Sequence, residues 1–154
     1  MPIEIDIQNA SDATDLPEKE EFHGWVEMAL NGHRKQAELT IRLVDEPESR
    51  ELNEQFRGRD EPTNILSFPY DAPAVVSSDL LGDLVICVPL VRREAAAQGK
   101  NISAHWAHLV VHGTLHLLGF DHQSDQEASL MEGVEVHILS RLGFPDPYLD
   151  DEKP

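Results

Sequence analysis

The sequence LVVHGTLHLLGFDH occupies residues 109–122, where an apolar run passes into three closely spaced histidines. His112 and His116 are four residues apart, which on a helix places both rings on one face with their Cβ atoms about 6 Å apart. Gly119 can end such a helix, because glycine adopts the left-handed conformation of a C′ residue without a Cβ penalty. The chain can then turn back and bring His122 to the same ion. The stretch therefore predicts a buried helix that carries a metal site.

Three neutral imidazoles with an open fourth position are typical of a catalytic zinc site, because structural zinc sites are usually closed by four protein ligands. The sequence therefore predicts a single Zn²⁺ per chain on His112, His116 and His122, although three imidazoles also suit other transition metals. A lone histidine on an apolar helix is more often a satisfied core residue. Two rings side by side in a buried helix need partners for their nitrogens, however, and a shared ion supplies them.

The spacing of these histidines and Gly119 equals that of the metzincin peptidases, which place a general-base glutamate directly after the first histidine. Gly113 occupies that position here. Without this proton acceptor, peptide hydrolysis is disfavoured on chemical grounds.

Three further side chains lie close to the cluster in sequence. His105 and His108 precede His112 at helical spacing, and His108 is the better candidate for contact with a ligand ring or with the substrate. Asp121 adjoins His122 and has three roles open to it: orienting a ligand, acting on a bound water, or capping the turn.

Length and composition favour one folded domain over residues 1–154. Hydrophobic residues make up 40% of the chain, which suits a single core. No apolar run is long enough to span a membrane, and the N-terminus lacks the basic and apolar regions of a signal peptide. Cys87 is the only cysteine and cannot form an internal disulfide. Together these features predict a cytoplasmic protein without membrane contact.

The chain is strongly acidic, with 12 basic and 29 acidic residues and a net charge of −17. This balance argues for solubility and against general binding to polyanions such as DNA. It leaves room for a nucleic-acid substrate in a local cationic cleft. Acidic residues concentrate in 12–21 and 146–152, and we expect those from about 146 onward to form a solvated, disordered tail.

Hydrophobic periodicity predicts alternating strands and helices, followed by helices alone. The expected strands are 3–7, 38–45, 64–68 and 80–88, and the last is apolar enough to be central in a sheet. Five helices are expected. The first spans 17–30 with Pro17 as its first residue, and the second begins at Pro47 with Leu52 and Phe56 as its apolar side. The third spans 89–98, the fourth is capped by Ser103 and ended by Gly119, and the fifth spans 124–141 with an apolar face of Leu130, Met131, Val134, Ile138 and Leu142. This order indicates an α+β fold: a small mixed sheet of about four strands, with helices packed against it and a zincin-like metal-site helix.

The motif from His112 to His122 also resembles the signature of the bacterial YbeY family of metal-dependent endoribonucleases. The segments Leu52-Asn53, Phe56-Arg57-Gly58 and Pro62-Thr63-Asn64-Ile65-Leu66-Ser67-Phe68 resemble a second block of that family, and Leu81-Gly82-Asp83-Leu84 resembles a third. The likeness covers roughly residues 38–140 in consistent order. The chain departs from the family pattern at Asn64, where aspartate is usual, and at Phe120, where tyrosine is usual.

The resemblance implies a zinc-type ion on the three histidines and a cytoplasmic, single-strand-specific endoribonuclease. It implies action near the 3′ end of 16S rRNA, a role in ribosome quality control, and ribosomal or ribosome-associated proteins as partners. It also implies that Arg57 faces the metal cleft as a catalytic residue. A guanidinium there would bind the scissile phosphate in bidentate geometry and stabilise charge in the transition state.

Alternatives remain open beside this interpretation. The chain could be a non-catalytic ribosome-assembly factor with a structural metal, or a zinc hydrolase of another substrate such as a peptide or ester. An open coordination position favours a catalytic role, and Gly113 weakens the peptidase version. We also hypothesise a cationic track for RNA formed by Arg59, Arg92, Arg93 and Lys100, against the alternative that these are solvated surface residues.

Overall fold

The computed structural model describes residues 2–70, 79–121 and 123–148. The elements in these ranges follow the predicted order: β1 (Ile3–Asn9), α1 (Lys19–Leu30), β2 (Ala37–Val44), α2 (Glu46–Arg57), β3 (Ile65–Pro69), β4 (Leu80–Cys87), α3 (Val88–Gln98), α4 (Ile102–Leu117) and α5 (Asp125–Arg141). The predicted α+β fold with a small mixed sheet is confirmed.

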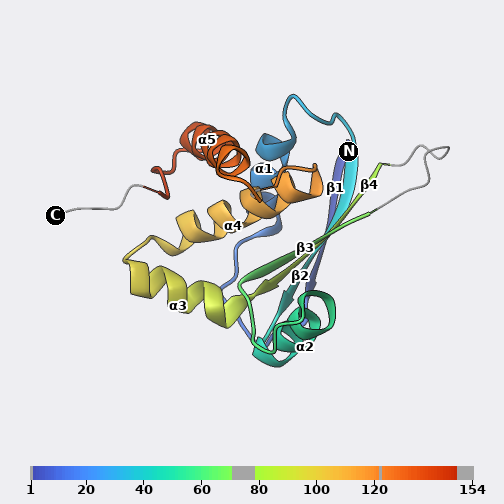
Figure 1. Cartoon of the computed structure of the whole chain (residues 1–154), viewed down its shortest axis with the longest axis vertical. Helices are drawn as coiled ribbons and strands as arrows, with labels where there is room; N and C mark the ends of the chain where they lie inside the picture. The colour runs from blue at the N-terminus through green and yellow to red at the C-terminus, as the bar shows by residue number, and fades with distance from the viewer. Residues whose placement is uncertain (1, 71–78, 122, 149–154) are drawn as a thin grey trace.

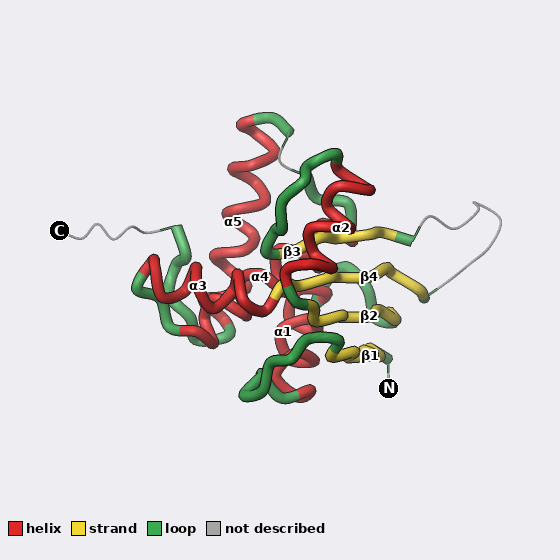
Figure 2. Tube along the Cα trace, turned by 90° about the horizontal axis from the view of Figure 1, so that it is seen from below, coloured by secondary structure: helices red, strands yellow, loops and turns green. Residues whose placement is uncertain are grey.

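The sheet has the strand order β1-β2-β4-β3. β1, β2 and β4 run parallel, and β3 pairs antiparallel to β4 at one edge. Figure 2 shows the strands side by side with the helices packed against them. β4 is an inner strand, as its continuous apolar run predicted, because both of its faces are covered.

Successive side chains of β4 point to opposite faces of the sheet, and each face has its own apolar cluster. On one face, Leu84 and Ile86 of β4 belong to the main core with α1 and α4. On the other face, Val85 and Cys87 belong to a smaller cluster, against which Leu52 of α2 packs. Figure 1 accordingly shows α1 and α4 on one side of the sheet and α2 apart from them.

Helix α4 is the centre of the helical layer and packs against β3, β4, α1, α3 and α5. Its N-cap is Asn101, whose side chain accepts a hydrogen bond from the Ala104 amide at 3.2 Å, so the predicted cap at Ser103 is wrong by two residues. Its end is as predicted. Gly119 has φ +106°, its amide donates to the His116 carbonyl at 3.0 Å, and the next amide donates to the Leu115 carbonyl at 3.0 Å. This Schellman motif turns the chain back after the histidine pair.

Three other expectations need correction. Helix α1 starts at Lys19 after the N-cap Glu18, so Pro17 precedes the helix. Phe56 and Leu130 were expected on apolar helix faces, yet 57% and 63% of their surfaces are exposed. Helical periodicity gave the correct elements but overestimated how far the core extends around α2 and α5.

The predicted acidic tail is only partly described, since residues 149–154 lie outside the described ranges. Tyr148 does not belong to a solvated tail, because its hydroxyl donates to Glu135 on α5. None of the helices in the described ranges is long and apolar enough to cross a membrane.

Candidate active site

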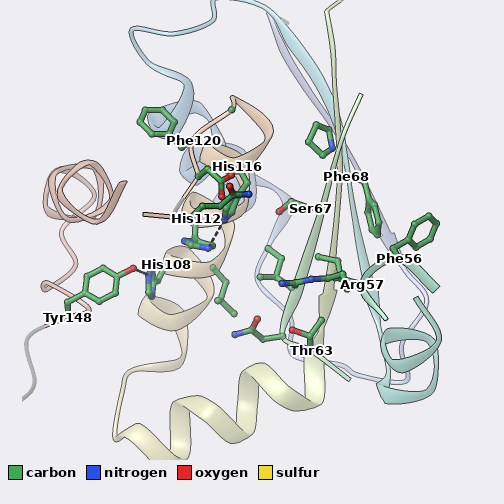
Figure 3. A pocket seen from close by; sticks show the side chains of 18 residues that line it. Phe56, Arg57, Thr63, Ser67, Phe68, His108, His112, His116, Phe120 and Tyr148 are labelled. Carbon is green, nitrogen blue, oxygen red and sulfur yellow. Dashed lines mark hydrogen bonds between the residues drawn. The ribbon is translucent and has the colours of Figure 1, made fainter. Parts of the chain in front are cut away.

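A cleft of about 960 Å³ runs along the edge strand β3, between it and α4. Figure 3 shows its histidines rising from α4 on one side and Arg57 reaching toward them from the side of α2. The lining residues on which the site is built are His108, His112, His116, Asp121 and Tyr148 on the helical side, and Phe56, Arg57, Asn64 and Phe68 on the strand side.

His112 and His116 face one another across one turn of α4. Their Nε2 atoms lie 3.1 Å apart, and their ring centroids are 4.6 Å apart with the rings nearly perpendicular. Two nitrogens that bind one zinc ion at about 2.0–2.1 Å in tetrahedral geometry lie about 3.3 Å from each other. The pair therefore fits a shared ion without rearrangement of the helix. His122, the predicted third ligand, lies outside the described residues.

Glu135 of α5 is fully buried behind this pair. One carboxylate oxygen accepts from His112 Nδ1 at 2.5 Å, and the other contacts His108 Nε2 at 3.0 Å and the Tyr148 hydroxyl. Burial alone would raise the pKa of Glu135, but the hydrogen bonds from His108, His112 and Tyr148 outweigh it and lower the pKa to about 2. Glu135 is therefore an ionised carboxylate with three donors around it.

This carboxylate decides how His112 is oriented. An ionised carboxylate can only accept hydrogen bonds, so His112 Nδ1 must donate to it. The proton on Nδ1 leaves the lone pair on Nε2, which is the atom that faces His116. Metal-binding histidines commonly show this arrangement, with the distal ring nitrogen held by a carboxylate.

Tyr148 closes the same network from the C-terminal side. Its hydroxyl donates to Glu135 and lies 3.1 Å from His108 Nε2. Burial and the neighbouring Glu135 carboxylate raise the pKa of Tyr148 above its usual range, so the hydroxyl stays protonated as a donor. His108 thus contacts the carboxylate that holds His112, in keeping with its expected place beside the ligand rings. Asp121 lines the cleft beyond the end of α4.

Arg57 is the last residue of α2 and lines the opposite side of the cleft. Its guanidinium makes no hydrogen bond or ion pair with any residue in the described ranges. Its neighbours differ: Arg50 pairs with Asp60 at 2.6 Å, and Arg59 approaches Glu61 at 3.9 Å. Among the described residues of this region, Arg57 is therefore available to a ligand in the cleft, whereas Arg50 and Arg59 lie next to carboxylates.

None of the four residues of the hypothesised cationic track lines the cleft. Arg92 donates to the Thr14 carbonyl, and Arg93 pairs with Glu46 at 2.6 Å. These two, Arg59 and Lys100 all lie off the cleft, and Arg57 is the only lysine or arginine among its described lining residues.

Gly113 faces the sheet rather than the cleft. A Cβ atom at this position would lie 2.7 Å from Ile65 Cδ1 and 2.8 Å from Leu84 Cδ2. α4 approaches the sheet so closely that no side chain fits there, and a glutamate at 113 would meet the core. The absence of a peptidase-type base is thus built into the packing of α4.

His105 and Asn64 take part in a second network at the base of the cleft. Asn64 Nδ2 donates to both oxygens of Glu94 at 3.1 and 3.3 Å, and His105 Nε2 lies 2.9 Å from Glu94 Oε1. Burial lowers the pKa of His105, against the opposing effect of Glu94. Through Glu94, His105 therefore connects α4 to α3 and to Asn64, which precedes β3, and it is not among the lining residues of the cleft.

Together these features define an α+β protein whose central helix presents a histidine pair to a cleft with a single open arginine. The family model described as "Endoribonuclease YbeY" matches residues 6–143, so this chain belongs to the YbeY family of endoribonucleases. The expected resemblance is confirmed, and with it membership of a family of hydrolases that cut RNA phosphodiester bonds.

Individual relatives agree over nearly the whole chain. Proteins named endoribonuclease YbeY from Pseudomonas putida strain W619 and from Pseudomonas syringae pv. tomato are each 56% identical over 151 residues. The alignments cover 97% of this chain and 96% and 90% of those relatives. The solution structure of TM1509 from Thermotoga maritima matches 95% of this chain and 99% of its own, at 25% identity and a TM-score of 0.59.

Proposed function

We propose that this chain is a metal-dependent, single-strand-specific endoribonuclease with a zinc ion on His112, His116 and His122. The observation that carries the proposal is the opposed Nε2 pair of His112 and His116 in the same cleft as the open Arg57 guanidinium. One side of the cleft offers nitrogen ligands and the other offers a phosphate-binding group. Membership of an endoribonuclease family supports the choice of RNA over other phosphate esters.

The residues divide the work between metal binding and substrate binding. Glu135 holds the proton on His112 Nδ1, which directs Nε2 toward the ion. When bound, a zinc ion supplies Lewis acidity and lowers the pKa of a coordinated water to about 7. Arg57 binds the non-bridging oxygens of the scissile phosphate and stabilises the charge that develops on them. Because no described carboxylate pairs with Arg57, both arms of the guanidinium are available to the phosphate.

We further propose the substrate and setting that family membership favours. The substrate is the 3′ region of 16S rRNA, cut during maturation of the small ribosomal subunit and during ribosome quality control. The protein works in the cytoplasm with ribosomal or ribosome-associated proteins, and DNA is not a substrate. The strong negative charge supports a dependence on such partners, because it disfavours unaided binding to a polyanion.

Two variants and a matched control test this proposal. His116→Ala removes a nitrogen from the pair, so it should lose both zinc and RNA cleavage. Arg57→Ala should keep zinc and lower the cleavage rate by about 100- to 1000-fold, since it removes one charge-stabilising group. Arg59→Ala is the control, because Arg59 lies two residues away but off the cleft.

The assays are zinc content by atomic spectroscopy and cleavage of a labelled single-stranded RNA, with the variants exposing any contaminating nuclease. Cleavage that survives in His116→Ala at the wild-type rate would reject a metal-dependent nuclease. Zinc-loaded wild-type protein that cuts no RNA, with an Arg57→Ala variant that still supports ribosome maturation, would favour the non-catalytic assembly factor.

A further inference from the structure

Among its described lining residues, the cleft has four aromatic rings and one lysine or arginine. The chain contains five phenylalanines, two tryptophans and two tyrosines. Phe56, Phe68, Phe120 and Tyr148 all line the cleft, whereas both tryptophans are buried in the core. Of the two most exposed aromatic side chains among the described residues, Phe56 therefore lies where RNA is expected to bind, whereas Tyr70 lies off the cleft.

Phe56 is the most exposed of these rings, with 57% of its surface accessible. It meets the half-buried Phe68 edge to face, with ring centroids 5.0 Å apart and an angle of 69° between the rings. Phe68 in turn packs against the small cluster that contains Leu66 and Val85. An edge-to-face contact covers at most one face of each ring, so Phe56 is anchored by Phe68 while a face stays accessible.

The charge distribution favours such a surface as a contribution to RNA binding. Phosphate contacts and counterion release usually dominate the affinity of proteins for nucleic acid. Here the net charge is −17, and Arg57 is the only lysine or arginine among the described cleft residues. Stacking of bases on aromatic side chains does not depend on net charge and is available only for unpaired bases.

We propose that Phe56, supported by Phe68, is a base-stacking subsite that holds an unpaired nucleotide next to the phosphate bound by Arg57. The inference rests on the proposed nuclease function and assigns to the strand side of the cleft the recognition of single-stranded RNA. Phe56 and Arg57 are consecutive residues in the last turn of α2. A nucleotide joins an aromatic face to an anionic phosphate, and this pair of side chains matches both parts.

The spatial arrangement supports a strand that crosses the edge of the sheet. Figure 3 shows Phe56 and Phe68 side by side beyond the strands from His112, with Arg57 extending toward the histidines. Both rings also line a hollow on the α2 face of the sheet, so a bound strand would pass around the edge at β3. The alternative ligand for the exposed Phe56 ring is an apolar segment of another protein. The open guanidinium beside the ring favours an anionic ligand. Arg57 lines the cleft that also holds the histidine pair, which favours the substrate itself.

The test compares three substitutions at Phe56 in the full-length protein. Phe56→Trp keeps an aromatic face, Phe56→Leu keeps apolar volume without one, and Phe56→Ala removes both. Binding of a fluorescein-labelled single-stranded RNA is measured by anisotropy in EDTA, and cleavage is measured with zinc. We expect Phe56→Leu and Phe56→Ala to weaken binding by about 5- to 150-fold, and Phe56→Trp to retain it. Leu130→Ala, an exposed apolar residue off the cleft, is the control and should bind as the wild type does.

An abasic scan of the same RNA provides an independent measurement. Replacing the base that stacks on Phe56 should weaken binding to the wild type and should have little effect on binding to Phe56→Leu. The dependence on salt should also be shallow. With one phosphate neutralised on a single strand, the slope of log K against log salt should be about −0.7.

Each alternative outcome rejects the subsite. If Phe56→Leu binds as the wild type does and only Phe56→Ala is weak, the ring is an apolar contact and the protein-segment occupant is favoured. If all three variants bind and cleave as the wild type does, Phe56 has no role in RNA binding, while the nuclease function stands. If the wild type neither binds nor cuts RNA, the subsite and the proposed function both fail.

Discussion

The two sides of the cleft are held in opposite ways. On the helical side, His112 and His108 contact one buried carboxylate, Glu135, and a tyrosine hydroxyl joins them. On the strand side, Arg57 makes no ion pair with the described residues, and Phe56 is mostly exposed. We refer to the first group, with His116, as the helix wall, and to Phe56, Arg57 and Phe68 as the edge wall.

The difference shows how the fold separates two requirements of catalysis. Metal ligands must be held in one geometry before the substrate arrives, which needs burial and hydrogen bonds that fix each ring. Groups that bind the substrate must instead keep their hydrogen-bonding capacity and apolar surface available for it. Changes to the helix wall should therefore affect stability and metal binding, whereas changes to the edge wall should affect only the binding and cleavage of RNA.

Replacing Glu135 should produce the largest effect. Glu135→Ala leaves His108, His112 and Tyr148 without their shared acceptor and opens a buried cavity. The free energy of unfolding should fall by about 2–5 kcal/mol. Zinc affinity should fall by about 10- to 100-fold, because His112 loses the group that orients it. Urea denaturation and competition with a zinc chelator measure the two effects.

Two further variants keep this experiment informative. Glu135→Gln preserves the shape of the side chain and separates loss of charge from loss of packing. Glu132→Ala, an exposed glutamate on the same helix, should change neither quantity. Unchanged zinc affinity in both Glu135 variants would show that the carboxylate supports the fold without positioning His112.

The contact between α4 and the sheet should be the next most sensitive position. Gly113→Ala places a methyl group within 3 Å of Ile65 and Leu84, and overpacking of this kind costs about 1–3 kcal/mol. Gly133 in α5 is a matched control, because a Cβ there meets nothing within 4 Å. Gly133→Ala should stabilise the protein by about 0.4–1 kcal/mol. In thermal unfolding, the melting temperature should therefore fall for Gly113→Ala and rise for Gly133→Ala. Equal effects at both positions would contradict the close approach of α4.

The network of Asn64, Glu94 and His105 beneath the cleft should make stability depend on pH. Burial holds the pKa of His105 below its unfolded value of 6.5, so the unfolded chain takes up this proton first as pH falls. The contribution of His105 to stability is therefore complete above about pH 7.5 and decreases as pH falls through about 6.5.

A His105→Asn variant isolates this contribution. The free energy of unfolding of wild type minus variant, measured by urea denaturation across this range, should decrease toward acid pH. A flat difference would mean that folding leaves the pKa of His105 unchanged, and a difference that increases toward acid pH would mean that pairing with Glu94 raises this pKa in the folded protein.

Much of the architecture was accessible from sequence because local patterns determine it. The apolar run of β4 predicted an inner strand, and Gly119 predicted the end of α4 through the conformation that only glycine adopts readily. Helix starts were less certain. Asn101 and Ser103 are both good capping residues, and the structure shows that the Asn101 side chain accepts from the Ala104 amide.

Glu135 shows what sequence analysis missed and what signal was available. It lies four residues after Met131 and three before Ile138, so all three share the buried face of α5. A glutamate in an apolar stripe requires buried partners, which is a detectable signal. Its partners are 23 and 27 residues earlier in the chain, and only the packing of α5 on α4 identifies them. For the same reason the sequence could not show which arginines line the cleft, since the directions of arginine side chains depend on which acids the fold brings near.

The smallest effect on stability is expected on the edge wall. Arg57→Ala should change the free energy of unfolding by no more than about 0.5 kcal/mol, because the side chain makes no ion pair with the described residues. Zinc content should be unchanged while RNA cleavage falls. The alternative role for Arg57 is to stabilise the C-terminus of α2 through the helix dipole, which can contribute as much as about 1 kcal/mol at low salt. Urea denaturation at low and high salt distinguishes the two, since a dipole contribution decreases with salt. A salt-sensitive loss of stability with normal RNA cleavage would make Arg57 a structural residue and would remove the contrast between the walls.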